Sequence, residues 1–235
     1  MKISVIIPAL NEAEQLADTI QICRQNDLVD AVFEIIVCDG GSLDGTQDIA
    51  VSRGAACIGS PRSGRAVQMN LGATVATGDI LMFVHADTRL PSGWTSHISE
   101  AIAEGYDAGC FRLSFGHPSP WLRFYGWVTR FDMDFMRFGD QGLFITKKSF
   151  EDLGGYREDH RVLEDNELTC RIRAKGLQFK VMAASAVTSP RRYLEQGVVR
   201  LQFIFAAIYL KWRMGVSQDD LIAYYRQKVR NRVPE

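Results

Sequence analysis

An apolar run ends abruptly in a histidine and an aspartate in the segment LMFVHADT, residues 81–88. A carboxylate such as Asp87 at the end of a strand can bind Mg²⁺ or Mn²⁺, because phosphate oxygens and water complete the shell of these ions. An aspartate in this position is also an ordinary turn or helix-cap residue. For His85 we favour a half-buried imidazole hydrogen-bonded to a carbonyl over a direct metal ligand.

A second group of polar residues follows another apolar run, in the stretch DGGSLDGT at residues 39–46. Asp39 could accept a hydrogen bond from the N–H of a nucleotide base. Gly40 and Gly41 would let the backbone approach a flat ligand closely. The same residue types are good turn formers, so this stretch alone does not decide between a loop and a binding site.

Two acids, Glu164 and Asp165, begin a predicted helix with the sequence EDNELTCRIRAKG. Acids in a first helical turn are ordinary partners of the helix dipole. If this helix end faces a crevice, however, Asp165 could take the proton from a hydroxyl as that hydroxyl attacks. Arg62 and Arg65 flank a predicted helix start and could contact phosphate, or be solvated surface residues.

Strands and helices alternate through the first half of the chain, and this order predicts a parallel, doubly wound sheet. Asn11 is the predicted N-cap of the first helix. The predicted strands there are 2–7, 32–38, 55–58 and 80–84, and the predicted helices are 11–23, 46–53 and 64–76. Residues 8–12, 39–44 and 85–88 then follow the carboxyl ends of strands and share one crevice, where ligands of such sheets bind.

The second half of the chain predicts a mixture of helices and strands packed on the first half. The aromatic-rich stretch from residue 117 to 142 fits no simple period. The predicted strands are 108–115, 142–146 and 179–187, and the predicted helices are 94–104, 148–153, 164–175 and a helical tail over 193–232.

Composition excludes several classes of protein. The 235 residues are 46% hydrophobic and 23% charged with a net charge of −1, which indicates globular folding and argues against a nucleic-acid partner. The cysteines form no C-x-x-C pair, so the sequence predicts neither a disulfide framework nor a zinc site. It predicts instead that the protein is located in the reducing cytoplasm. The N-terminal stretch MKISVIIPALNE resembles a first strand and not a signal peptide.

The helix predicted over 198–214 has a strongly apolar stretch interrupted by Arg200, Gln202 and Lys211. Because a membrane span needs roughly 20 apolar residues, we reject a transmembrane helix. A core helix or a homodimer contact is the first interpretation. The alternative is an amphipathic helix in peripheral contact with the inner face of the membrane, which would suit a lipid-linked acceptor.

Four stretches, in this order, resemble family 2 glycosyltransferases of the GT-A fold: SVIIPALNE, VCDGGSLDGT, GDILMFVHADT and LGGYREDHRVLEDNELTCRIRAKG. A small cytoplasmic bacterial branch of this family carries similar H-A-D-T and G-D-Q-G elements and an R-R-Y/W segment. The resemblance implies a Rossmann-like α/β fold, with a mixed, mainly parallel sheet flanked by helices and with C-terminal helices. It also implies a nucleotide-sugar half at 1–90, an acceptor half of the same domain at 91–190, and a helical tail at 191–235.

The resemblance further implies an inverting transfer from a nucleotide-diphosphate sugar, UDP-type favoured, assisted by a divalent metal, Mn²⁺ or Mg²⁺. Asp165 would be the general base, helped by Glu164, and Asp87 would bind the metal. The donor would be bound by Pro8, Ala9, Asn11, Glu12, Asp39, Gly41, Arg65, His85, Ala86, Arg191 and Arg192. The acceptor would be bound by Asp140, Gln141 and Trp121.

His85 stands where the resemblance expects the first acid of a D-x-D element, and we expect it to line the nucleotide pocket without binding metal. Arg191 and Arg192 lie near the place where relatives often have a metal-proximal histidine, and their charges could neutralise the diphosphate instead. Two other functions stay open. A nucleotidyltransferase would usually have a Gly-rich loop in place of PALNEAEQ, and a non-catalytic nucleotide-sugar-binding module would not need Asp165.

Overall fold

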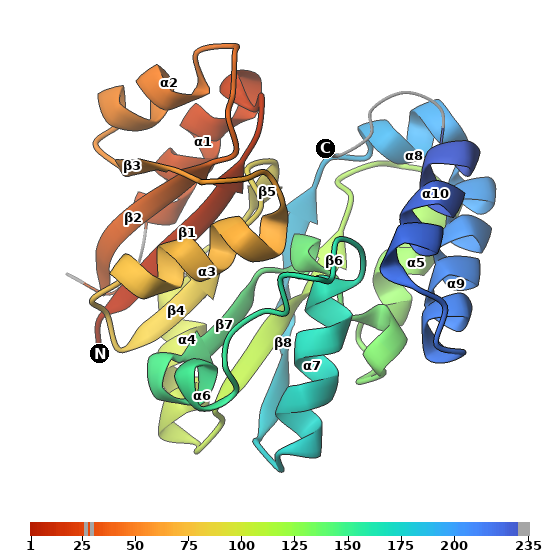
Figure 1. The fold of residues 1–235 in the computed structure, drawn as a ribbon. Coiled ribbons are helices and arrows are strands. Elements are labelled where there is room, and N and C mark those ends of the chain that lie inside the picture. The colour runs from red at the N-terminus through yellow and green to blue at the C-terminus, as the bar shows by residue number, and fades with distance from the viewer. Residues whose placement is uncertain (26–27, 29–30, 230–235) are drawn as a thin grey trace.

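The computed structural model describes residues 1–25, 28 and 31–229 (Figure 1). Within these ranges one eight-stranded sheet has the order β3-β2-β1-β4-β7-β6-β8-β5. The strands are β1 (Ile3–Ala9), β2 (Val32–Asp39), β3 (Ala56–Gly59), β4 (Ile80–Phe83), β5 (Thr88–Arg89), β6 (Ala108–Ser114), β7 (Leu143–Thr146) and β8 (Phe179–Thr188).

Pairing in the sheet is mixed, as the sequence predicts. Strands β3, β2, β1 and β4 run parallel, and β6 runs parallel to β8. Strand β7 is antiparallel to both β4 and β6, and β5 is antiparallel to β8. The carboxyl ends of β1, β2, β4 and β6 therefore meet at one edge of the sheet, where parallel sheets bind ligands.

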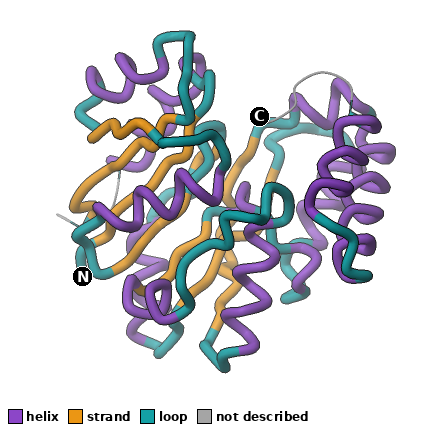
Figure 2. Tube along the Cα trace, viewed as in Figure 1, coloured by secondary structure: helices purple, strands orange, loops and turns teal. Residues whose placement is uncertain are grey.

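Helices cover both faces of the sheet (Figure 2). The helices are α1 (Ala13–Arg24), α2 (Thr46–Ser52), α3 (Arg65–Val75), α4 (Trp94–Ala103), α5 (Pro120–Val128), α6 (Lys147–Asp152), α7 (Glu164–Ala174), α8 (Arg191–Gln196), α9 (Val198–Arg213) and α10 (Gln218–Lys228). Two single turns of 3₁₀ helix, η1 (Asp134–Met136) and η2 (Gly139–Gln141), precede β7.

Strand periodicity explains the two layers. In β1, Val5 and Ile7 pack with α1 and α4 on one face, whereas Ile6 packs with α3 and α7 on the other. Alternate side chains of a strand point to opposite faces, so an unbroken apolar run such as VII at residues 5–7 is buried on both sides. A third cluster joins β6 to α5, α8, α9 and α10, which lie together beside the sheet (Figure 1).

Most predicted elements are confirmed with end shifts of one or two residues, but three details differ. Helix α1 begins at Ala13, and Asn11 is not its N-cap because it adopts the left-handed region with φ 55°. Helix α5 and the short strand β5 have no counterpart in the prediction. The predicted tail divides into α8, α9 and α10, and its last predicted residues, 230–232, lie outside the described residues.

One sheet includes strands from both the predicted donor half and the predicted acceptor half, so the strand order does not separate the two. The division into a donor half, an acceptor half and a tail stays a prediction. In the part of the chain that the structure describes, no helix combines the length and the apolar character that crossing a membrane requires.

We predict that Gly109→Ala destabilises the fold. A methyl group on Gly109 in the middle of β6 would meet the Lys180 carbonyl oxygen and lie 2.6 Å from a ring carbon of Phe144. Overpacking of this kind costs about 1–3 kcal/mol, which urea denaturation would measure as a lower free energy of unfolding. Gly59→Ala is the matched control, since its methyl group would meet nothing within 4 Å. Equal stability of both variants would contradict the packing described for β6.

Candidate active site

The loops that follow β1 and β2 are joined by hydrogen bonds. The Asn11 amide donates to Ser42 Oγ at 2.8 Å, and Asn11 Oδ1 accepts from the Leu43 amide at 2.9 Å. The Glu12 amide donates to Thr46 Oγ1 at 2.9 Å. The left-handed backbone of Asn11 thus serves to connect two loops. Beside them is a cavity of about 250 Å³ lined by Asn11, Glu12, Glu14, Gln15, Asp44 and Arg191.

Asp39, the last residue of β2, is 1% exposed and accepts hydrogen bonds from its own loop. Its Oδ2 accepts from the amides of Gly41 and Ser42 at 3.0 Å each and from Gln47 Nε2 at 2.6 Å. Burial alone would raise the pKa of Asp39, but the hydrogen bonds from Ser42, Gln47 and Gly41 outweigh it and lower that pKa. Asp39 is therefore ionised and holds the loop rigid.

Gln68 is a site residue that the sequence analysis missed. Its buried side chain on α3 donates from Nε2 to the carbonyl oxygens of Ala9 at 2.9 Å and Cys38 at 2.6 Å. A methyl group on Gly40 would lie 3.2 Å from this amide nitrogen. Gln68 therefore connects the ends of β1 and β2. The sequence could have indicated it, because Gln68 is a polar residue on the inner side of the predicted helix 64–76. Pro8 and Ala9 form the buried end of β1 beside it.

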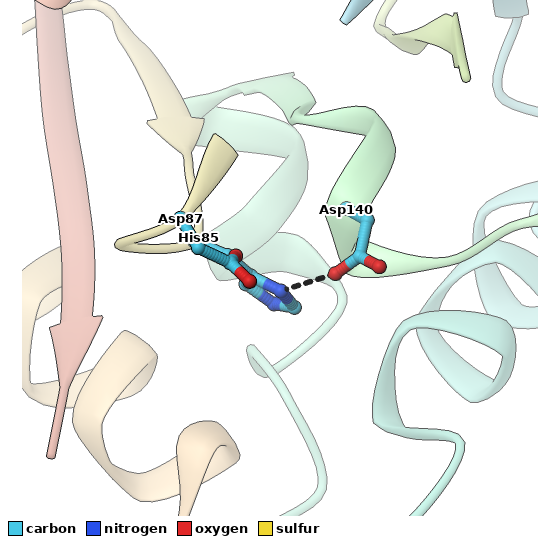
Figure 3. Close-up of side chains that lie close together, drawn as sticks. All are labelled: His85, Asp87 and Asp140. Carbon is cyan, nitrogen blue, oxygen red and sulfur yellow. Dashed lines mark hydrogen bonds and ion pairs between the residues drawn. The ribbon is translucent and has the colours of Figure 1, made fainter. Parts of the chain in front are cut away.

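His85, Asp87 and Asp140 form the one group of histidine, cysteine or acid side chains, among the residues described, that could hold a metal ion. Their ligand atoms all lie within 4.8 Å of one another. Figure 3 shows the three side chains turned toward each other, with His85 Nδ1 2.8 Å from Asp140 Oδ1. The turn that carries His85 is fixed because Thr19 Oγ1 donates to the Ala86 carbonyl at 2.6 Å.

The pKa values in this cluster shift in a consistent way. Burial, together with Asp140, raises the pKa of Asp87 despite the nearby positive charges of His85 and Arg192. Burial also opposes ionisation of Asp140, yet the hydrogen bond and charge of His85 lower its pKa to about 2. The pKa of His85 is raised, because the hydrogen bond and charge of Asp140 outweigh burial. The cluster therefore favours a positive charge at its centre.

Gly139 separates this cluster from the predicted general base. A methyl group built on Gly139 would clash with His85 Nε2 on one side and lie 2.7 Å from Asp165 Oδ2 on the other. The sequence analysis did not single out Gly139, although it belongs to the G-D-Q-G element. Asp165 is 9% exposed, and the Tyr156 hydroxyl donates to its Oδ1 at 3.3 Å.

Glu164 and Arg65 form a partly buried ion pair. Arg65 Nε lies 2.6 Å from Glu164 Oε1, and Glu164 is 1% exposed. Burial raises the pKa of Glu164, and the charge of Arg65 offsets this only in part. The pKa of Arg65 is raised because Glu164 and Asp165 outweigh its own burial. Arg62, by contrast, pairs with Glu158 at the surface.

Arg191 and Arg192, which were predicted to neutralise the diphosphate, are the first two residues of α8. Arg191 Nη1 lies 3.9 Å from Glu14 Oε2 and lines the cavity beside the joined loops. The charge of Arg192 lowers the pKa of Asp140 and opposes the rise in the pKa of Asp87, so it acts on the cluster of His85, Asp87 and Asp140. Both side chains are exposed at their positions and available to a ligand.

The three predicted acceptor residues have different surroundings. Asp140 belongs to the cluster with His85. Gln141 is fully buried, and its Oε1 accepts from the Phe138 amide at 3.1 Å. Trp121 is 61% exposed on α5.

Comparison with known proteins gives one family and several relatives. The family model described as glycosyl transferase family 2 matches residues 4–155. The chain is 30% identical over 179 residues to the PGL/p-HBAD biosynthesis glycosyltransferase of Mycobacterium bovis, which covers 72% of this chain and 68% of that protein.

Two solved structures share the fold. The mannosyltransferase PcManGT from Pyrobaculum calidifontis, in complex with GDP-Man and Mn²⁺, has a TM-score of 0.69 and 19% identity. The match covers 100% of this chain and 66% of that one. Staphylococcus aureus TarS 1–349 in complex with UDP-GlcNAc has a TM-score of 0.64 and 19% identity, over 80% of this chain and 58% of that one. The chain thus spans less than two thirds of either solved protein.

We predict that Asp39→Asn destabilises the protein in a pH-dependent way. The new NH₂ group would face amide donors, and loss of a buried charge-assisted acceptor costs about 1–3 kcal/mol. Because the folded pKa of Asp39 lies below its ordinary value of 3.8, this stability is present above pH 3.8 and disappears as the pH falls through the folded pKa.

Urea denaturation of wild type and Asp39→Asn between about pH 6 and about pH 2 checks this, and the two stabilities should converge in acid. The exposed Asp48→Asn variant is the control. A stability difference that stayed constant down to the lowest pH would disprove the role given to the Asp39 carboxylate.

Proposed function

The chain belongs to glycosyl transferase family 2, and from this premise we propose that it transfers a sugar, with inversion, from a nucleotide-diphosphate sugar to an acceptor hydroxyl. The observation that carries the proposal is the position of Asp165, which faces the His85 cluster across Gly139. A buried carboxylate next to a cation-binding cluster is what an acid–base transfer from a diphosphate donor requires.

The donor nucleoside is assigned to the crevice between the joined loops. The cavity beside Asn11 and Glu12 supports this assignment, because hydrogen bonds already hold its walls in place. A UDP-type donor is favoured. The related folds have been solved with GDP-Man and with UDP-GlcNAc, so the choice of base is a matter for measurement.

The residues of the cluster fit a divalent metal. Asp87 and Asp140 supply two carboxylates, and burial together with the charge of Asp140 raises the pKa of Asp87, which a bound cation would offset. We assign His85 to orienting Asp140 through its Nδ1 hydrogen bond. When bound, Mn²⁺ or Mg²⁺ supplies charge neutralisation on the leaving diphosphate.

In this proposal, some residues of the chain act on the acceptor hydroxyl and others act on the leaving diphosphate. Asp165 accepts the proton of the acceptor hydroxyl as its oxygen bonds to the anomeric carbon and the bond to the diphosphate breaks. The Tyr156 hydroxyl and the Glu164–Arg65 pair hold Asp165 and its helix end in position. Arg191 and Arg192 stabilise the negative charge that grows on the diphosphate. A nucleotidyltransferase or a purely binding module would not need Asp165 as a base for an acceptor hydroxyl.

We predict that Asp165→Asn lowers sugar transfer while leaving donor binding intact. Removal of a general base lowers kcat by about 10²–10⁴-fold. Release of nucleoside diphosphate from UDP-glucose and GDP-mannose measures turnover, and calorimetry measures donor affinity. Glu195→Gln, an exposed acid on α8, is the control. Unchanged turnover in Asp165→Asn would overturn the assignment of the base.

We predict that Asp87→Asn weakens Mn²⁺ binding more strongly than His85→Gln. Loss of a residue that only orients a ligand costs about 10–100-fold in metal affinity, and loss of a ligand costs more. Titration of Mn²⁺ followed by electron paramagnetic resonance gives both affinities. If His85→Gln abolishes binding as completely as Asp87→Asn, the imidazole is itself a ligand and the assignment above is wrong.

A further inference from the structure

A second cavity, of about 430 Å³, lies between the end of β6 and helix α5. Its volume falls within the range of small-molecule sites. The residues that matter for its chemistry are Arg112, Arg123, Arg130, His117, Trp127 and Ser185. None of the residues proposed above for donor, metal or catalysis lines it.

The charge of this cavity is one-sided. Arg112, Arg123 and Arg130 line it, and no aspartate or glutamate does so among the described residues. Within the same described ranges, none of the three arginines takes part in an ion pair. The Nε of Arg112 is buried without a hydrogen-bond partner. A buried donor without a partner costs free energy, so an anionic ligand there would be stabilising.

Aromatic rings continue from the cavity along α5 and the turn that follows it. Trp127 lines the cavity and stacks with Phe124 at a ring-centre distance of 6.0 Å. Phe131 meets Trp127 edge-on at 5.1 Å, and Arg130 lies 5.2 Å from the Trp127 ring centre. All three rings are exposed. The cationic cavity thus opens beside an apolar surface that the chain leaves uncovered.

We propose that this cavity binds a phosphate group carried on an apolar or aromatic body, at a site separate from the crevice of sugar transfer. Arginine forks make charge-assisted, bidentate hydrogen bonds to phosphate oxygens, which the three guanidinium groups can supply. The ring row contacts the apolar body. A soluble phosphoester and a phospholipid headgroup share this chemistry. The proposal does not depend on the transfer reaction.

The test uses phenyl phosphate as the probe and the full chain, with EDTA present to keep metal from the crevice. We expect calorimetry to detect binding of phenyl phosphate to the wild type. The double variant Arg123→Ala with Arg130→Ala should weaken this binding by about 10-fold or more, because it removes charge-assisted hydrogen bonds to the phosphate. Arg53→Ala with Arg226→Ala removes the same charge from exposed positions elsewhere. Arg191→Ala with Arg192→Ala tests the crevice. The Arg53/Arg226 control pair should bind phenyl phosphate as the wild type does, and the Arg191/Arg192 pair should keep the binding that the Arg123/Arg130 pair loses.

A second arm identifies the source of the phosphate. Vesicles of phosphatidylglycerol and of phosphatidylcholine are sedimented with wild type and with the Arg123/Arg130 double variant. If the wild type binds the anionic vesicles and the double variant does not, the phosphate belongs to a lipid headgroup. If the wild type binds phenyl phosphate but not the vesicles, the phosphate belongs to a soluble phosphoester. The proposal is overturned if neither probe binds, if the double variant binds both as well as the wild type, or if the crevice pair alone loses binding.

Discussion

Six acidic side chains lie at the carboxyl edge of the sheet, and the burial of their charges is the constraint on which the candidate site depends. They are Glu12, Asp39, Asp87, Asp140, Glu164 and Asp165. Removal of a carboxylate from water opposes its ionisation, and neighbouring carboxylates oppose it further. The fold meets this constraint in three ways, which differ from one acid to the next. Asp39 receives amide and hydroxyl donors from its own loop, Glu164 receives Arg65, and Asp140 receives His85.

Asp87, like Glu12 and Glu164, has a pKa that burial and a neighbouring carboxylate raise. His85 and Arg192 act on it from a distance, but burial and Asp140 still raise its pKa. An acid in this state is stabilised by a cation, and Asp87 is the one of the three whose oxygen also lies in the group that could hold a metal ion. Because Gly139 has no side chain, η2 can approach His85 closely. Asp140 on η2 then does two things: its charge raises the pKa of Asp87, and its carboxylate pairs with His85.

The sequence predicted most of the fold because the strands are short β-branched or apolar runs that end in turn residues. It predicted Asp39 and Asp87 at one edge because strand ends in a parallel sheet converge there, whereas Asp165, which begins a helix, was placed there only by the family resemblance. It missed Gly139 and Gln68, since each acts through a close contact with a segment far away in the chain, which no local pattern reveals. It missed α5 because the aromatic residues PWLRFYGWV are apolar on several sides, so no helical period stands out.

The hydrogen bonds between the loops after β1 and β2 have an energetic consequence for recognition. Asn11 holds an unusual left-handed backbone, and Ser42, Leu43 and Thr46 fix the opposite loop, before any nucleotide arrives. The loss of backbone freedom has then already occurred during folding, where the cooperative core compensates it. A ligand entering this crevice has little chain entropy left to remove, so a larger part of its contact energy is retained as affinity.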